Sequence, residues 1–223
     1  MKPPSVVAAS EAKIEERPPP PGERRTSHKW LGERSKQEYE RKNDRLELYV
    51  SKLSEEKIRN HAMSAAQDRL EVMGFLMGNV YRNGDVMYSL VRDVATTDLE
   101  ASSVRVRFQR EGMERLFASI DDCGFSYILL GWYHSHPGHR CFLSPTDVDT
   151  QTAMFSQSYH SALVIDPIHK EIEAFCVEKG RAIRRPFAVY WDQYQNPYFG
   201  ETVKRRRLKT EGSSPPENES TGP

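Results

Sequence analysis

Hydrophobic and polar residues follow two kinds of pattern along the middle of the chain. Runs of mostly apolar residues bounded by turn residues predict buried strands, since a strand covered on both faces carries few polar residues. The turn residues "RNGD" at 82–85 predict a hairpin that leads into another strand at 86–95. Residues 103–109, "SVRVRFQ", alternate strictly and predict a strand with one basic face. The runs with strand composition occupy residues 46–51, 70–81, 126–136, 161–167 and 171–180.

Three other segments show the pattern of helices. In residues 54–70, apolar and small side chains recur at helical spacing, and Ser54 is a candidate N-cap. Residues 110–123 predict an amphipathic helix that ends at a glycine, and residues 144–157 begin a further helix at Ser144. Strands that alternate with a few helices predict an α/β fold, in which helices flank a sheet.

Both ends of the chain differ from the middle in composition. Residues 1–42 are rich in proline and charge and hold few large apolar groups, so they cannot bury enough surface to offset the entropy lost on ordering. We therefore predict a disordered tail at 1–42, one folded domain at 43–195 and a second tail at 196–223. The second tail carries "KRRRLK" and then a low-complexity polar stretch. This basic cluster fits either a solvated charge run or a docking site for an acidic partner.

Composition argues against several classes of function. The 223 residues carry a formal net charge of +0, whereas nucleic-acid binders usually have a basic excess, so no nucleic acid is expected as a partner. The three cysteines form no CxxC pair, so neither a disulfide framework nor a cysteine-based zinc site is expected. No apolar run reaches the ~20 residues needed to span a membrane, and Met1–Ser10 lacks the apolar core of a signal peptide. We therefore expect a cytoplasmic protein without a membrane partner.

Two histidines stand near the end of the run at 126–136. His134 and His136 are two positions apart, so in a strand they project from the same face and can hold one cation between them. An HxH pair is weak evidence by itself, because exposed histidines and histidines with other partners show the same spacing.

The polar stretch "LSPTD" follows within a dozen residues. Ser144 before a proline is typical of an N-cap, and Asp147 then falls at the third helical position, where a carboxylate favours the helix dipole. This capping role does not exclude a role for Asp147 as a third ligand, since two histidines and one carboxylate with an open position form a catalytic zinc site. Asp149 is a rival carboxylate that should point elsewhere.

Hydrolysis at such a site needs a general acid/base. Glu71 is the candidate, because a carboxylate next to an otherwise apolar, buried strand is unusual unless it has a role there. The alternative is that Glu71 only marks the exposed start of that strand. Glu171 and Glu173 alternate with apolar residues and are expected on the solvent face of a strand.

"HSHP" followed by "SPTD" has the form H-[ST]-H-P-x(6)-S-x-x-D. With the upstream "EVMGFLMG" strand it resembles the JAMM motif of MPN-domain metalloproteases, and "GWYHSHPG" and "VIDP" are most similar to the deubiquitinase subunit of the proteasome lid and its archaeal relatives. The resemblance implies an MPN fold with a mixed, curved sheet. It also implies that His134, His136 and Asp147 bind one zinc ion, that Glu71 is the general acid/base, and that Ser144 helps to hold the carbonyl oxygen or the attacking water.

The resemblance further implies a substrate, the isopeptide bond between the carboxy-terminal tail of ubiquitin or a ubiquitin-like protein and a lysine. In the family, a loop that corresponds to residues 95–108 orders into strands and pairs with this extended tail. An ordinary loop with an edge strand is the alternative, and Trp132 fits core packing as well as a substrate groove. The residues expected to contact the substrate are Ser103, Val104, Arg105, Val106, Trp132, Cys141 and Phe142.

Three hypotheses of function follow from the sequence. The leading one is a zinc-dependent isopeptidase, a deubiquitinase, that works beside the proteasome or another large assembly. The second is a scaffold subunit without activity. The third is a hydrolase of the same fold that acts on a different modifier or on a small substrate.

Overall fold

The computed structural model describes residues 14–96 and 127–192. The chain divides into two compact units, Met1–Tyr190 and Trp191–Pro223, and every element named here belongs to the first. The strands are β1 (Glu15–Glu16), β2 (Arg25–Ser27), β3 (Leu48–Ser51), β4 (Met73–Asn83), β5 (Val86–Thr96), β6 (Ile128–Ser135), β7 (Ser161–Asp166), β8 (Glu171–Glu178), β9 (Arg181–Arg184) and β10 (Ala188–Tyr190). The helices are α1 (Glu33–Lys42), α2 (Lys52–Ala65) and α4 (Pro145–Met154), with the short 3-10 helices η1 (Gly22–Arg24) and η2 (Asn43–Arg45).

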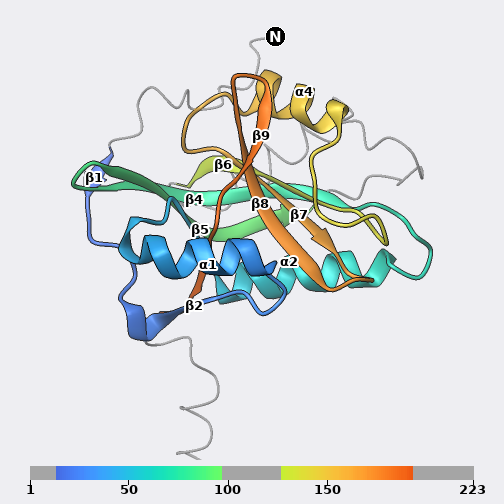
Figure 1. The fold of residues 1–223 in the computed structure, drawn as a ribbon, viewed down its shortest axis with the longest axis horizontal. Helices are drawn as coiled ribbons and strands as arrows, with labels where there is room; N and C mark the ends of the chain where they lie inside the picture. The colour runs from blue at the N-terminus through green and yellow to red at the C-terminus, as the bar shows by residue number, and fades with distance from the viewer. Residues whose placement is uncertain (1–13, 97–126, 193–223) are drawn as a thin grey trace, which may run out of the picture. The chain divides into compact units, whose positions relative to one another are not determined.

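One mixed, curved sheet organises the first unit. Its strand order is β2-β10-β3-β5-β4-β6-β7-β8-β9, and β1 pairs with β4 off this path. The pairs β10–β3, β3–β5 and β6–β7 are parallel, whereas β4 is antiparallel to both β5 and β6. Figure 1 shows α1 and α2 on one side of the strands and α4 on the other. The predicted fold, a mixed curved sheet flanked by helices, is therefore confirmed.

The predicted elements correspond closely to the described ones. β4 and β5 form the predicted hairpin, and the strands at 46–51, 126–136, 161–167 and 171–180 appear as β3, β6, β7 and β8. α2 begins three residues early, because the Ser51 hydroxyl, not that of Ser54, accepts from the backbone at the N-cap. The pattern misses β9, whose residues are all exposed. The strand expected at 103–109 and the helix at 110–123 lie outside the described residues.

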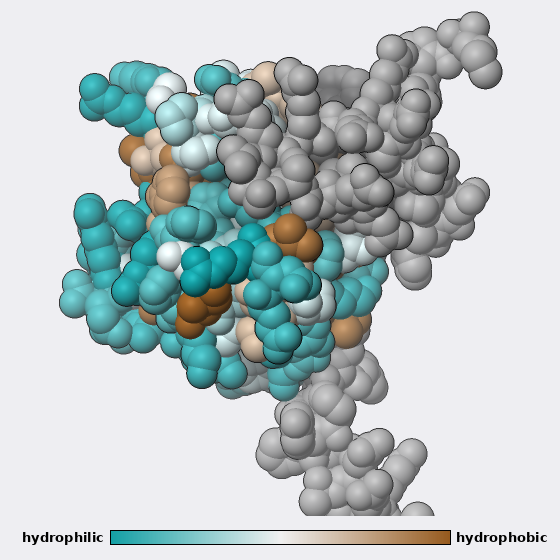
Figure 2. Space-filling view, turned by 90° about the vertical axis from the view of Figure 1, so that its right-hand side faces the viewer, coloured by the Kyte–Doolittle hydropathy of each residue, from teal (hydrophilic) through white to brown (hydrophobic). Residues whose placement is uncertain are grey.

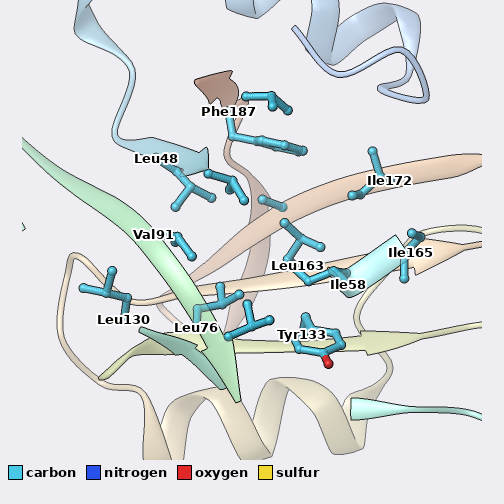
Figure 3. Packing of buried hydrophobic residues seen from close by; sticks show 14 of the residues in the cluster. Leu48, Ile58, Leu76, Val91, Leu130, Tyr133, Leu163, Ile165, Ile172 and Phe187 are labelled. Carbon is cyan, nitrogen blue, oxygen red and sulfur yellow. The ribbon is translucent and has the colours of Figure 1, made fainter. Parts of the chain in front are cut away.

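The hydrophobic core lies between the sheet and α2. Leu76 in β4, Val91 in β5 and Leu163 in β7 belong to one hydrophobic cluster with Ile58 of α2, and each of these side chains is fully buried (Figure 3). The face of the molecule seen in Figure 2, in contrast, is mostly hydrophilic, with a few hydrophobic residues exposed on it. No helix within the described ranges is long and apolar enough to cross a membrane.

Residues 14–42 are folded, which corrects the prediction of a disordered tail for this part of the chain. They form β1, β2 and α1, and Leu31, only 2% exposed, makes a β-bridge to Ile172 in β8. Nearby, Nε2 of buried His28 lies 2.8 Å from Oε1 of buried Glu55 in α2. Composition does not predict this N-terminal arm, residues 14–42, because a few contacts with residues distant in the sequence hold it in place. Such contacts leave no periodic pattern in the sequence.

Glu173 in β8 lies at the junction of this arm with the sheet. The sequence places its side chain on the solvent face, but it is 7% exposed. Its carboxylate accepts hydrogen bonds from the Ser35 hydroxyl at 2.6 Å and from the Gly32 backbone N–H at 3.2 Å. A buried carboxylate needs such donors, so Glu173 fastens the start of α1 to β8.

We expect Ser35→Ala to lower the free energy of unfolding by about 1–3 kcal/mol, because it leaves an oxygen of buried Glu173 without its shortest donor. Urea denaturation followed by circular dichroism measures the change. Ser64→Ala is the matched control: its hydroxyl also donates one hydrogen bond, to the His61 carbonyl, but at an exposed position. Equal effects of the two substitutions would show that the arm is not fastened at Glu173.

Candidate metal centre

Two histidines at the end of β6 share one face of the sheet. His134 and His136 are 2% and 5% exposed, and their ring centroids lie 4.7 Å apart. The His134 ring stacks on Trp132, two residues earlier on the same face, with centroids 4.3 Å apart. The alternation of side chains along a strand thus brings the two imidazoles together, with an indole ring beside them.

The third member of the cluster comes from the first turn of α4. Ser144 is the N-cap: its hydroxyl accepts from the Asp147 N–H at 3.2 Å, and its own N–H donates to Asp147 Oδ2 at 2.7 Å. This capping box turns the Asp147 side chain back toward β6. Oδ2 then lies 3.6 Å from His134 Nε2 and 3.8 Å from His136 Nε2. The cap and the approach to the histidines therefore share one carboxylate oxygen.

Three observations indicate that His134, His136 and Asp147 can bind a metal ion. One ligand atom from each of His134, His136 and Asp147 lies within 4.8 Å of the others, and ligands at about 2.1 Å from one tetrahedral ion are about 3.4 Å apart. Among the described residues, neither ring nitrogen of buried His134 has a hydrogen-bond partner. Buried polar atoms are rarely left so, which points to a ligand at this position. Two imidazoles and a carboxylate are a donor set that suits zinc.

The orientation and charge state of the His136 ring suit a ligand. Its Nδ1 lies 3.3 Å from the Arg140 carbonyl oxygen, which can only accept, so Nδ1 carries the proton and Nε2 offers its lone pair. Burial, reinforced by His134, lowers the pKa of His136 to about 4, which leaves the ring neutral at pH 7. Burial raises the pKa of Asp147, but His134 and Ser144 outweigh it and bring the pKa to about 2.

The register between β4 and β6 brings Glu71 to the same face. Met73, the first residue of β4, pairs with His134 in antiparallel register, and opposed residues point to the same side; Glu71 lies two positions before this pair. Ser135 extends the pairing, since its hydroxyl accepts from the Val72 N–H at 3.0 Å. Burial raises the pKa of Glu71, the charge of His134 opposes this, and that of Asp147 adds to it. Glu71 is thus half-buried beside the cluster.

The residues expected to contact substrate fall into different places. Phe142 is 45% exposed and its ring centroid lies 4.8 Å from that of His136, so it is open beside the cluster. Trp132 is 3% exposed and donates from Nε1 to Gln151 of α4 at 2.7 Å, which fits the alternative of core packing. Cys141 is 7% exposed and packs in a small hydrophobic cluster with residues of β7 and β8. The remaining four, at 103–106, lie outside the described residues.

We expect Cys141 to resist alkylation in the folded protein. Burial raises the pKa of its thiol, and its Sγ lies 3.3 Å from the Val164 carbonyl oxygen, so the reactive thiolate is scarce. Mass spectrometry of the Cys141 peptide after iodoacetamide treatment at pH 8 measures this, with urea-denatured protein as the control. Equal labelling of both samples would contradict the prediction.

Two residues that support the cluster have no sequence motif of their own. Gln151, 2% exposed, holds the Trp132 indole with one end and the Phe155 carbonyl with the other, at 2.7 and 3.2 Å. Asp166, fully buried at the end of β7, accepts from the backbone of the turn that follows His136. Asp166 lies in the stretch "VIDP", where the aspartate–proline pair indicated only a turn.

Comparisons with known proteins give relatives of this chain. COP9 signalosome complex subunit 5 of Debaryomyces hansenii is 33% identical over 153 residues, which are 67% of this chain and 30% of that protein. The subunits 5 of Yarrowia lipolytica and Drosophila melanogaster are 35% and 32% identical over 155 and 157 residues, with 67% and 68% of this chain and 40% and 44% of those proteins covered. These relatives are signalosome subunits, so they support the family but not the narrower resemblance to the proteasome-lid subunit. The chain spans less than half the length of each.

A solved structure and a family model complete the comparison. The solution structure of a protein from Desulfitobacterium hafniense has a TM-score of 0.50 at 22% identity and covers 66% of this chain and 97% of that one, which shows a similar fold. The model described as JAB1/Mov34/MPN/PAD-1 ubiquitin protease matches residues 44–159, a range that includes the three members of the cluster and Glu71. The chain therefore belongs to the JAB1/Mov34/MPN/PAD-1 ubiquitin protease family.

Proposed function

We propose that this chain is a zinc-dependent isopeptidase that releases ubiquitin or a ubiquitin-like protein from lysine side chains. The observation that carries the proposal is the convergence of His134, His136 and Asp147 within 4.8 Å, on the face of the sheet to which β4 brings Glu71. A metal cluster with a half-buried carboxylate beside it is what metal-assisted hydrolysis requires. The family description, ubiquitin protease, supports the class of substrate.

Each residue has a role in the proposed reaction. His134, His136 and Asp147 would hold zinc, which when bound polarises the scissile carbonyl and makes water a better nucleophile at neutral pH. The Glu71 carboxylate would take a proton from the attacking water and pass it to the leaving lysine amine. Its raised pKa suits both halves of this transfer. The Ser144 hydroxyl, which caps α4 through Asp147, would also donate to the oxygen that gains charge.

The ubiquitin tail would bind along residues 103–106 and against Phe142, which is exposed next to His136. We further propose that the chain works in the cytoplasm as part of a large assembly, because the relatives compared are subunits of the COP9 signalosome. A scaffold role would not require a complete ligand set beside a carboxylate.

We expect the purified chain to cleave di-ubiquitin or a ubiquitin-like conjugate, to lose this activity with 1,10-phenanthroline as chelator, and to regain it with about one equivalent of zinc. Gel analysis of a panel of conjugates, with metal content measured in parallel, tests the proposal. Bound zinc without cleavage of any ubiquitin-like conjugate would favour a hydrolase of another substrate class. Absence of metal binding would leave the scaffold hypothesis.

A further inference from the structure

The Asp166 carboxylate at the end of β7 accepts hydrogen bonds from two parts of the chain near the candidate metal centre. It is fully buried and takes part in five hydrogen bonds. Three of them are local, from the backbone N–H groups of Ile168 and His169 at 2.9 and 3.1 Å and with His169 Nδ1 at 2.7 Å. These three alone would make Asp166 an ordinary cap of the β7–β8 turn.

The other two hydrogen bonds reach a different part of the chain. Asp166 Oδ1 accepts from the Gly138 N–H at 3.0 Å, and Oδ2 accepts from the Arg140 N–H at 2.8 Å. Both donors belong to the turn that follows His136, and both have left-handed backbone conformations, with φ of 86° and 67°. Such a conformation is unfavourable for arginine and persists only where its surroundings hold it. Asp166 supplies the charged acceptor that holds this turn.

This turn then sets the orientation and the tautomer of the His136 ring. Once the Arg140 N–H is fixed on Asp166, the Arg140 carbonyl oxygen lies 3.3 Å from His136 Nδ1. A carbonyl accepts only, so this contact keeps the proton on Nδ1 and leaves the Nε2 lone pair for the cluster, where Nε2 lies 3.8 Å from Asp147 Oδ2. The path from Asp166 to the cluster thus has two hydrogen bonds, one on each side of the Arg140 residue.

We propose that Asp166 is a positioning residue for the metal centre: through the turn at 137–140 it fixes the tautomer and orientation in which His136 offers Nε2 to the ion. The part that concerns the metal rests on the proposed function, whereas the part that concerns the tautomer does not. Partners of this outer kind orient a ligating imidazole, and their loss usually weakens metal affinity about 10–100-fold. Asp166 does not touch the substrate or the ion.

Asp166→Asn tests the proposal. In one orientation the side-chain NH₂ of the asparagine faces the Arg140 N–H, and in the other it faces the Gly138 N–H, so the turn loses an acceptor either way. We expect the Nδ1-protonated fraction of His136 to fall in long-range ¹H–¹⁵N spectra of the metal-free protein. We expect zinc affinity, measured by competition with a chelating dye, to fall about 10–100-fold.

His169→Ala is the matched control. It removes one local hydrogen bond of Asp166 and leaves both bonds to the 137–140 turn in place. We expect it to keep the wild-type His136 tautomer and a zinc affinity within about twofold, below the range expected for an outer partner. If His169→Ala and Asp166→Asn changed the tautomer equally, Asp166 would act only as the cap of the β7–β8 turn, and the proposal would be overturned.

Gly138→Ala is the second variant, in case Asp166→Asn does not fold. Among the described residues, a Cβ at Gly138 would meet Ile168 Cδ1 alone, at 3.5 Å, so the change strains the backbone of the turn without a clash there. The same loss of the Nδ1 tautomer is expected. An unchanged His136 spectrum in every folded variant would overturn the proposal. If the wild-type chain bound no zinc, the proposed function would fail, while the metal-free spectra would still decide whether Asp166 sets His136.

Discussion

Glu71→Gln is expected to leave the fold and the zinc affinity unchanged and to lower the rate of conjugate cleavage about 10²–10⁴-fold, the range typical of the loss of a general acid/base. The substitution keeps the size of the side chain but removes its ability to take a proton. Because Glu71 is not a member of the His134–His136–Asp147 cluster, the metal should remain bound. Single-turnover cleavage of a di-ubiquitin substrate, with zinc content measured on the same sample, gives both quantities.

Glu178→Gln is the matched control for this experiment, since it makes the same chemical change at an exposed position at the end of β8. It should cleave at the parent rate. A Glu71→Gln variant as active as the parent would mean that Glu71 is only the start of β4 and that another group moves the proton. A variant that lost zinc as well would place Glu71 among the ligands.

His134→Phe should abolish activity without loss of stability in the metal-free protein. Both ring nitrogens of His134 are buried without a hydrogen-bond partner among the described residues, which is unfavourable by about 1–3 kcal/mol per unsatisfied group. A phenyl ring keeps the stacking on Trp132 and removes these polar atoms. We expect the free energy of unfolding of the metal-free protein to stay equal or rise. Zinc affinity should fall more than about 100-fold, beyond the loss caused by an outer partner.

His160→Phe provides the contrast, because His160 is also buried but accepts a hydrogen bond at Nδ1 from the Gln157 N–H at 3.1 Å. Its replacement leaves that donor unpaired and should lower the free energy of unfolding by about 1–3 kcal/mol. Urea denaturation in the presence of a chelator compares the two variants. A loss of stability for His134→Phe as large as that for His160→Phe would mean that His134 is a satisfied core residue. A functional site that reduces stability is a common trade-off.

The arm at residues 14–42 shows where reasoning from composition stops. Its charge and proline content predict a segment without a hydrophobic face. The arm is nevertheless held, because Leu31 is inserted into the core and Ser35 donates to a buried carboxylate. The burial of Glu173, which the arm contacts, also cannot be predicted from the local sequence pattern. Alternation within β8 predicts a solvent face for Glu173, but the docked arm donates hydrogen bonds to its buried carboxylate. Contacts between residues so far apart in the chain have no local signature.

The sequence alone determined the local geometry of this protein. Strand periodicity put His134 and His136 on one face, and the Ser144–Asp147 spacing defined the capping box, because both depend only on neighbouring residues. The tertiary structure decided what lies beside them. The β4–β6 register brings Glu71 to the histidines across more than sixty positions of chain, and the β7 end brings Asp166 to the turn after His136. Strand register and buried polar contacts depend on how the whole sheet packs, so no segment specifies them by itself.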